Sequence, residues 1–189
     1  MNTRALAWRL HWYRQSELEG ALLLGRMVRM ATDEALCARL TRHCADEARH
    51  SVLWSKVIGR LRLPYVRILR SYQSFYGAVP ATLTEVLAFT QIFEGRVHMQ
   101  FALEARDSDT PDEARRTFEV MIEDERDHLT WVRDWLQARP ESAALLRKYE
   151  AIDAYVYRQI EPYTDRLWEI DGLGRESEIY DPQPLLECA

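Results

Sequence analysis

The sequence predicts an all-α protein: a four-helix bundle with a long crossover between its second and third helices, followed by a C-terminal fifth helix. The 189-residue chain contains only 7 Gly and 7 Pro, and it is rich in residues that favour helices. Apolar residues recur every three to four positions along its long stretches, which is the period of one helical face. About twenty residues without that period separate the second stretch from the third, as a connection running the length of a bundle requires.

The first helix is expected over about residues 2–31. Trp12, Glu19 and Met27 fall on one face of it at helical spacing. Glu17 is the alternative acidic residue, but it lies off that face. Glu19 is therefore the predicted inward carboxylate of this helix.

The second helix is expected over about residues 32–61. Thr32 is placed to cap its first turn, and Pro64 follows its end. Its predicted inward face consists of Leu40, His43 or Cys44, Glu47, His50, Trp54, and Val57 or Ile58.

The crossover, residues 62–81, leaves room for a short helix over about 63–75. Four arginines cluster around its beginning, and they are Arg60, Arg62, Arg67 and Arg70. Such a cluster is either a solvated surface or a docking point for an anionic or carrier-bound substrate.

The third helix is expected over about residues 82–106, with Glu94 and His98 on its inward face. Pro111 marks the start of a fourth helix that runs to about residue 138. The fifth helix follows over about 141–170, interrupted by Pro162. The whole chain, 1–189, is predicted to be a single domain with its core bundle at about 2–138 and the fifth helix and tail at about 141–189.

The candidate metal ligands are two Glu-x-x-His pairs and one single Glu in the helix before each pair. They are Glu19, Glu47, His50, Glu94, Glu125 and His128. Residues three apart on a helix point the same way, so a Glu and a His at that spacing can grip one ion. On a solvated face such a pair would form a salt bridge instead, but here both pairs lie on apolar faces.

Hard oxygen ligands with imidazole suit iron or manganese. Four glutamates balance two divalent ions, whereas four carboxylates buried without metal would be very costly. The pattern is the ligand set of carboxylate-bridged di-iron bundles. It predicts two Fe ions or an Mn/Fe pair.

Residues 46–50, Asp-Glu-Ala-Arg-His, resemble the Asp-Glu-x-Arg-His motif of the ferritin-like di-iron superfamily, best known in bacterial multicomponent monooxygenases. The second copy, residues 124–128, keeps Asp-Glu-x-x-His but has Asp127 in place of Arg. By pattern the resemblance covers roughly residues 14–135, and it implies a ferritin-like bundle. It also implies that Asp46 and Asp124 accept hydrogen bonds from the ligand histidines.

Several branches of that superfamily differ from this chain at telling positions. Rubrerythrin-like peroxidases add a carboxylate where this chain has Val97, and bacterioferritins place a haem-ligating Met where it has Ala48. Multicomponent hydroxylases carry Thr at the position of His98, which is here a third nitrogen ligand, a proton donor or a core histidine. Ribonucleotide reductase small subunits carry a radical Tyr at the position of Trp54, which either relays electrons or packs in the core.

The resemblance implies a non-haem dinuclear oxidase or oxygenase that activates O₂, acts on a small organic substrate and takes electrons from an external donor. The alternatives are a ferroxidase with iron storage, a peroxide scavenger, and a metal-free binding protein with a vestigial site. A monomer or homodimer is expected of an oxygenase.

Other sequence properties limit the partners. The net charge of −5 argues against nucleic acid. No apolar run is long enough to span a membrane, and the N-terminus lacks an apolar signal core, so a cytoplasmic location is expected.

Overall fold

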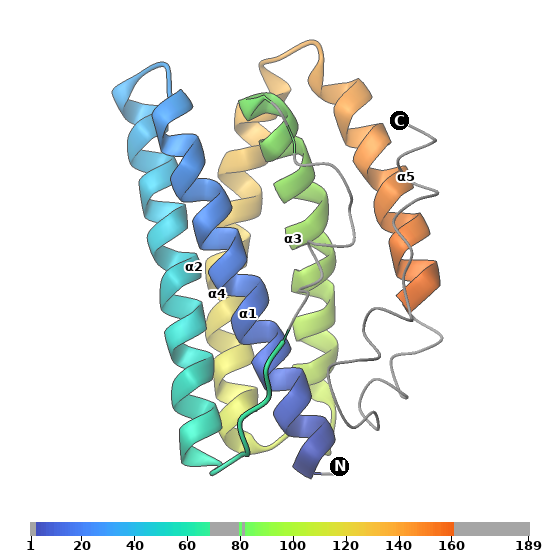
Figure 1. Ribbon diagram of the computed structural model, residues 1–189. Coiled ribbons are helices and arrows are strands. Elements are labelled where there is room, and N and C mark those ends of the chain that lie inside the picture. Colours follow the sequence, from blue (N-terminus) through green and yellow to red (C-terminus); the bar gives the residue numbers. More distant parts are fainter. Residues whose placement is uncertain (1–2, 69–79, 81, 161–189) are drawn as a thin grey trace.

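The computed structural model describes residues 3–68, 80 and 82–160. Five α-helices and one 3₁₀ turn form within these residues. They are α1 (Thr3–Met27), η1 (Val28–Met30), α2 (Glu34–Arg60), α3 (Leu83–Arg106), α4 (Asp112–Gln137) and α5 (Ser142–Ile160). The helices α1 to α4 form a bundle, with α5 beside α3 (Figure 1). The predicted all-α architecture with five helices is confirmed for this part of the chain.

The connection between α2 and α3 joins two helix ends at opposite ends of the bundle. The helix α2 ends at one end of the bundle, and α3 begins at the opposite end (Figure 1). Residues 63–68 form no regular element, so the predicted short helix over 63–75 does not begin there. Its remainder, together with Arg70, lies outside the described residues.

Local sequence signals account for the helix boundaries. Asp33, not the predicted Thr32, is the N-cap of α2, and its carboxylate accepts a hydrogen bond of 2.9 Å from the backbone N–H of Leu36. Thr32 donates its hydroxyl proton to Asp33 instead. Thr82 caps α3 through the N–H of Glu85.

Two apolar layers lie at the two ends of the bundle with a polar layer between them. One layer includes Leu40 of α2 and Val132 of α4. The other includes Trp54 of α2 and Phe118 of α4. Each bundle helix contributes residues to both layers, and one buried glutamate of each helix, Glu17, Glu47, Glu94 or Glu125, falls between them. The apolar residues thus provide the burial that stabilises the bundle and cover the acidic layer toward both ends of the bundle.

The helix α5 packs against α3 outside the bundle (Figure 1). Asp153 of α5 accepts hydrogen bonds from the guanidinium of Arg96, and that guanidinium lies 4.1 Å from the ring centre of Tyr157. The part of the predicted fifth helix beyond residue 160, with Pro162 and the tail, lies outside the described residues. None of the described helices is long and apolar enough to cross a membrane.

Candidate metal centre

The middle layer of the bundle holds two groups of buried acidic and histidine side chains. The first group is Glu17, Glu47, His50 and Glu125, and the second is His43, Glu47, Glu94 and His128. Within each group, one possible ligand atom from every residue lies within 4.8 Å of all the others. All four bundle helices contribute, and Glu47 belongs to both groups. The two groups are therefore neighbours joined by one carboxylate.

The spacing of these atoms suits metal ions. An imidazole nitrogen or carboxylate oxygen binds a metal at about 2.1 Å, so ligand atoms on opposite sides of one ion are about 4.2 Å apart. The observed limit of 4.8 Å exceeds this value by only a few tenths of an ångström. Small side-chain adjustments would close that difference without movement of the helices.

In the first group, three carboxylates surround one nitrogen of His50. Its Nδ1 lies 3.2 Å from Glu17 Oε2, 3.8 Å from Glu47 Oε1 and 3.9 Å from Glu125 Oε1. The imidazole is fully buried, and Glu17 and Glu125 are only 4% and 2% exposed. This group offers one nitrogen and up to six oxygens to an ion.

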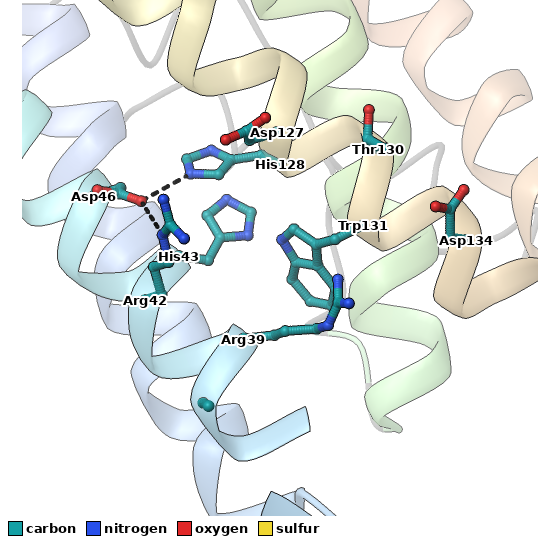
Figure 2. A pocket seen from close by; sticks show the side chains of 10 residues that line it. Arg39, Arg42, His43, Asp46, Asp127, His128, Thr130, Trp131 and Asp134 are labelled. Carbon is teal, nitrogen blue, oxygen red and sulfur yellow. Dashed lines mark hydrogen bonds and ion pairs between the residues drawn. The ribbon is translucent and has the colours of Figure 1, made fainter. Parts of the chain in front are cut away.

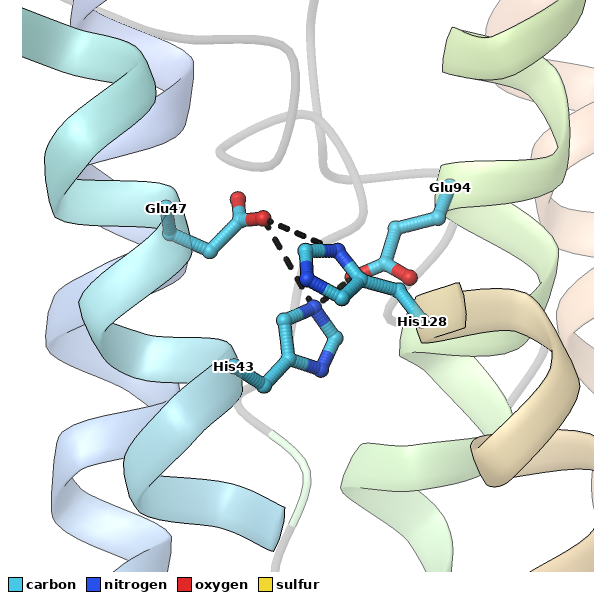
Figure 3. Close-up of side chains that lie close together, drawn as sticks. All are labelled: His43, Glu47, Glu94 and His128. Carbon is cyan, nitrogen blue, oxygen red and sulfur yellow. Dashed lines mark ion pairs between the residues drawn. The ribbon is translucent and has the colours of Figure 1, made fainter. Parts of the chain in front are cut away.

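In the second group, two imidazoles approach the carboxylates (Figure 3). His43 Nε2 lies 2.8 Å from Glu94 Oε1 and 3.6 Å from Glu47 Oε1. His128 Nδ1 lies 3.4 Å from Glu47 Oε1 and 3.6 Å from Glu125 Oε2. Because the other oxygen of Glu125 approaches His50, Glu125 also reaches both groups. The second group is richer in nitrogen than the first.

Several buried atoms of these groups have no hydrogen-bond partner among the described residues. They are His43 Nδ1 and Nε2, Glu47 Oε1, Glu94 Oε2, Glu125 Oε2 and His128 Nδ1. Buried polar atoms are normally paired, because each unpaired one costs about 1–3 kcal/mol. Four of these atoms, His43 Nε2, Glu47 Oε1, Glu125 Oε2 and His128 Nδ1, take part in the close contacts of the second group. Metal ions bound between them would satisfy these atoms, so the residues present fit a dinuclear metal site.

An outer set of side chains holds two of the histidines. His50 donates from Nε2 to Asp124 of α4 at 3.0 Å, and His128 donates from Nε2 to Asp46 of α2 at 3.5 Å. Arg49 joins the two aspartates, at 2.6 Å from Asp124 and 3.4 Å from Asp46. Each histidine thus donates to an aspartate of the opposite helix, which leaves its Nδ1 free to bind metal.

The electrostatics of the layer favour cations. Burial, and then the charge of Glu47, raise the pKa of Glu17 to about 7. Burial and the charges of Glu94 and Glu47 raise the pKa of Glu125 well above its usual range. Burial alone would lower the pKa of His50, but the hydrogen bond to Glu17 and the surrounding carboxylates raise it to about 10. Positive charge between these carboxylates is therefore stabilised.

The first helix presents Glu17 to the site, and the expectation for Glu19 is corrected. Glu19 is only half-buried, belongs to neither group and accepts a hydrogen bond from Gln15 at 2.9 Å. The error came from the face chosen. Trp12 is buried, but Glu19, seven residues further along the helix, is only half-buried, so the face that contains Trp12 does not carry a buried carboxylate into the site. The seven-residue spacing of Leu10, Glu17 and Leu24, all buried, is the signal that identifies the inward face.

The second group contains His43, a residue that was not among the predicted ligands. It lies four residues before Glu47 on the same inward face, a spacing that already placed it on the predicted stripe. His98 lies outside both groups. Burial, followed by the charge of Arg126, lowers the pKa of His98. A third imidazole beside the carboxylates therefore comes from α2 and not from α3.

Trp54 lies one turn beyond His50, in the apolar layer. Its ring stacks on Tyr13 with centres 5.6 Å apart, and it contacts Phe118 edge-on at 4.8 Å. Trp54 is completely buried. These contacts give it a packing function.

A pocket of about 590 Å³ opens between α2 and α4 beside the second group. Figure 2 shows His43 and His128 among its lining residues, together with Trp131 and two arginines, Arg39 and Arg42. The two histidines are only 1% and 3% exposed, so they form the inner wall. The pocket thus leads from the surface to the second group.

Comparison of the chain with known protein families, with curated proteins and with solved structures finds no match. The interpretation of the site therefore rests on its own residues and geometry.

Proposed function

We propose that the protein binds two metal ions, Fe/Fe or Mn/Fe, between its four bundle helices and uses them for O₂-dependent oxidation of a small organic substrate. The observation that supports this most strongly is the pair of buried ligand groups joined by Glu47. Such sharing brings two ions close enough to act together. The ferritin-like resemblance of residues 46–50 and 124–128 points to the same chemistry.

The residue types support iron or manganese. Glu17, Glu47, Glu94 and Glu125 supply carboxylate oxygens, and imidazoles supply the remaining ligands. Two divalent ions would balance the four carboxylates and remove the cost of burying them together. Bound in this way, a metal pair supplies reduction of O₂ and oxidation of an organic molecule.

The chain itself would hold and shield that pair. The contacts with Asp124 and Asp46 fix the rings of His50 and His128, so that the same nitrogen of each ring faces the ions. The apolar layers on either side keep bulk water from reaching the metals along the bundle axis. We propose that electrons come from an external donor.

Oxidation of an organic molecule is favoured over iron storage by the pocket between α2 and α4. Its volume of about 590 Å³ falls in the range of sites for small organic ligands. A storage protein needs only a path for hydrated iron, whereas here a ligand-sized space reaches His43 and His128. The working unit is proposed to be a monomer or homodimer.

Anaerobic loading with Fe(II), followed by exposure to O₂, tests the proposal. We expect about two ions per chain and a transient absorbance band that decays faster when a substrate is present. Glu47→Ala should abolish both signals, because it removes the shared ligand. Glu119→Ala, which changes an exposed glutamate of α4, is the control. The proposal would be contradicted if Glu47→Ala kept both the two bound ions and the absorbance band. Assembly into a hollow shell that mineralises excess iron would contradict it as well.

A further inference from the structure

We infer that the pocket between α2 and α4 binds the carboxylate of a small organic acid with an apolar body. As an assignment of the substrate class, this inference rests on the proposed function. Three features of the pocket support it: an unpaired imidazole nitrogen at its inner wall, arginines at its mouth, and a tryptophan on its α4 side.

One histidine of the inner wall, His43, has a ring nitrogen without a hydrogen-bond acceptor within the described ranges. His50 and His128 each donate their outer nitrogen to an aspartate, but His43 has no such partner. Its Nε2 is turned toward Glu94 and Glu47, and its other nitrogen is turned away from them (Figure 3). That second nitrogen, Nδ1, is buried and has no hydrogen-bond partner in the described part of the chain.

When Nε2 binds a metal, Nδ1 of a neutral imidazole carries the proton and needs an acceptor. Because His43 lines the pocket, a ligand in the pocket can provide that acceptor. A carboxylate oxygen suits this position best, because a charged acceptor forms a stronger hydrogen bond than a neutral one.

The arginines lie on the same side of α2 as His43. Arg39 precedes His43 by four residues, which is one helical turn, and it makes no ion pair among the residues that the structure describes. The side chain of Arg42 is 81% exposed, and its contact with Asp46 is loose at 4.0 Å. Both guanidinium groups are therefore available to a carboxylate that also reaches His43.

Two of the three aspartates of the pocket are already paired with positively charged or hydrogen-bonding neighbours. Asp46 is already in contact with His128 and Arg49, and Asp134 lies 3.1 Å from Arg133. Asp127 is exposed at the mouth and makes no ion pair within residues 3–68 and 82–160. Its charge would repel a second carboxylate on the ligand, so the pocket should prefer monocarboxylates.

Trp131 provides the apolar surface. Its half-buried indole lies on the α4 side of the pocket and meets the ring of His43 edge-on, with ring centres 5.7 Å apart. A ring or short hydrocarbon packed on this indole would lie beside the second group. An aryl or alkyl monocarboxylate would place its carboxylate at His43 and the arginines and its apolar body on Trp131.

Calorimetric titration of the Mn(II)-loaded and the metal-free protein with phenylacetate tests the inference. Phenylacetamide and phenethylamine serve as the neutral and cationic probes of similar shape. We expect phenylacetate to bind at least tenfold more tightly than either probe, and Arg39→Gln to weaken its binding by about tenfold, as expected for loss of a charge-assisted contact. Trp131→Leu should weaken the binding of phenylacetate and of phenylacetamide by the same factor.

Arg116→Gln is the matched control. It removes the same charge from an exposed position on α4, where Arg116 pairs with Glu113, and it should leave the affinity for phenylacetate unchanged. 1,4-Phenylenediacetate, with its second carboxylate, should bind more weakly than phenylacetate.

The outcomes separate this inference from the proposed function. The assignment of the pocket is overturned, even if two metals bind, by either of two results. One is an affinity for phenylacetamide equal to that for phenylacetate, and the other is an unchanged affinity for phenylacetate in Arg39→Gln. Arg39-dependent binding of phenylacetate to a protein that takes up no metal supports the assignment of the pocket and overturns the proposed function.

Discussion

The exchange of Glu17 or Glu19 for glutamine separates two neighbouring glutamates that differ sharply in environment. Glu17 is 4% exposed and lies 3.2 Å from His50, whereas Glu19 is half-buried and outside both groups. Glu17→Gln replaces one of four ligand residues of the first group with a weakly coordinating amide. We therefore expect this variant to retain about one ion instead of two, and Glu19→Gln to retain both.

The magnitude follows from the ligand count. Loss of an outer partner of a metal ligand costs about 10–100-fold in affinity, so loss of the ligand itself should cost at least 100-fold. At free metal equal to 100 times the dissociation constant, one ion stabilises the fold by about 2.7 kcal/mol, and a 100-fold weaker site leaves about 0.4 kcal/mol. The difference of about 2.3 kcal/mol corresponds to about 5–9 °C in Tm for a protein of this size.

The assay is a thermal melt of wild type and both variants, with and without Mn(II), combined with metal analysis after desalting. The metal-dependent rise in Tm should shrink by about 5–9 °C in Glu17→Gln. It should stay within about 1–2 °C of wild type in Glu19→Gln, as expected for a substitution outside the site. A normal rise in Glu17→Gln together with a reduced rise in Glu19→Gln would refute the assignment of the first helix.

Further substitutions test the remaining parts of the site. His43→Ala should lower metal content to about one ion per chain, whereas His98→Gln should retain two; the reverse pattern in metal analysis would restore His98 as the third nitrogen ligand. Asp124→Asn should weaken metal binding by about 10–100-fold, measured by competition with a chelator, and an unchanged affinity would show that the contact with His50 does not support the site. Trp54→Ala should lower the free energy of unfolding by about 3–5 kcal/mol in urea titrations, and a loss below about 1 kcal/mol would contradict its packing function.

Most of the fold could be predicted because each bundle helix has a clear apolar period and identifiable ends. The inward face of α2 was predicted correctly at most positions, since Leu40, Glu47, His50 and Trp54 are all buried as predicted. The cap of this helix was missed because Thr32 and Asp33 are both good capping residues. The backbone geometry, which the sequence does not reveal, selects Asp33.

The site was harder to predict where a helix has more than one apolar face. The helix α1 buries both Trp12 and Glu17, although they do not share the seven-residue spacing, so the apolar period alone pointed to Glu19 and not to Glu17, which lies in the first group. His43 was on the predicted face, but the Glu-x-x-His pattern drew attention only to His50. Five of the six predicted ligands nevertheless occupy the two groups. Four of them belong to the Glu-x-x-His pairs, whose spacing fixes a common direction, and the fifth is Glu94.

Anomalous X-ray diffraction from crystals loaded with Fe(II) or Mn(II) tests the central claim most directly. The account predicts two peaks in the polar layer of the bundle, one surrounded by Glu17, His50 and Glu125 and the other by His43, Glu94 and His128. Glu47 should lie between them and contact both. A single peak elsewhere, such as at the exposed aspartates of the pocket, or no peak within the bundle, would contradict it.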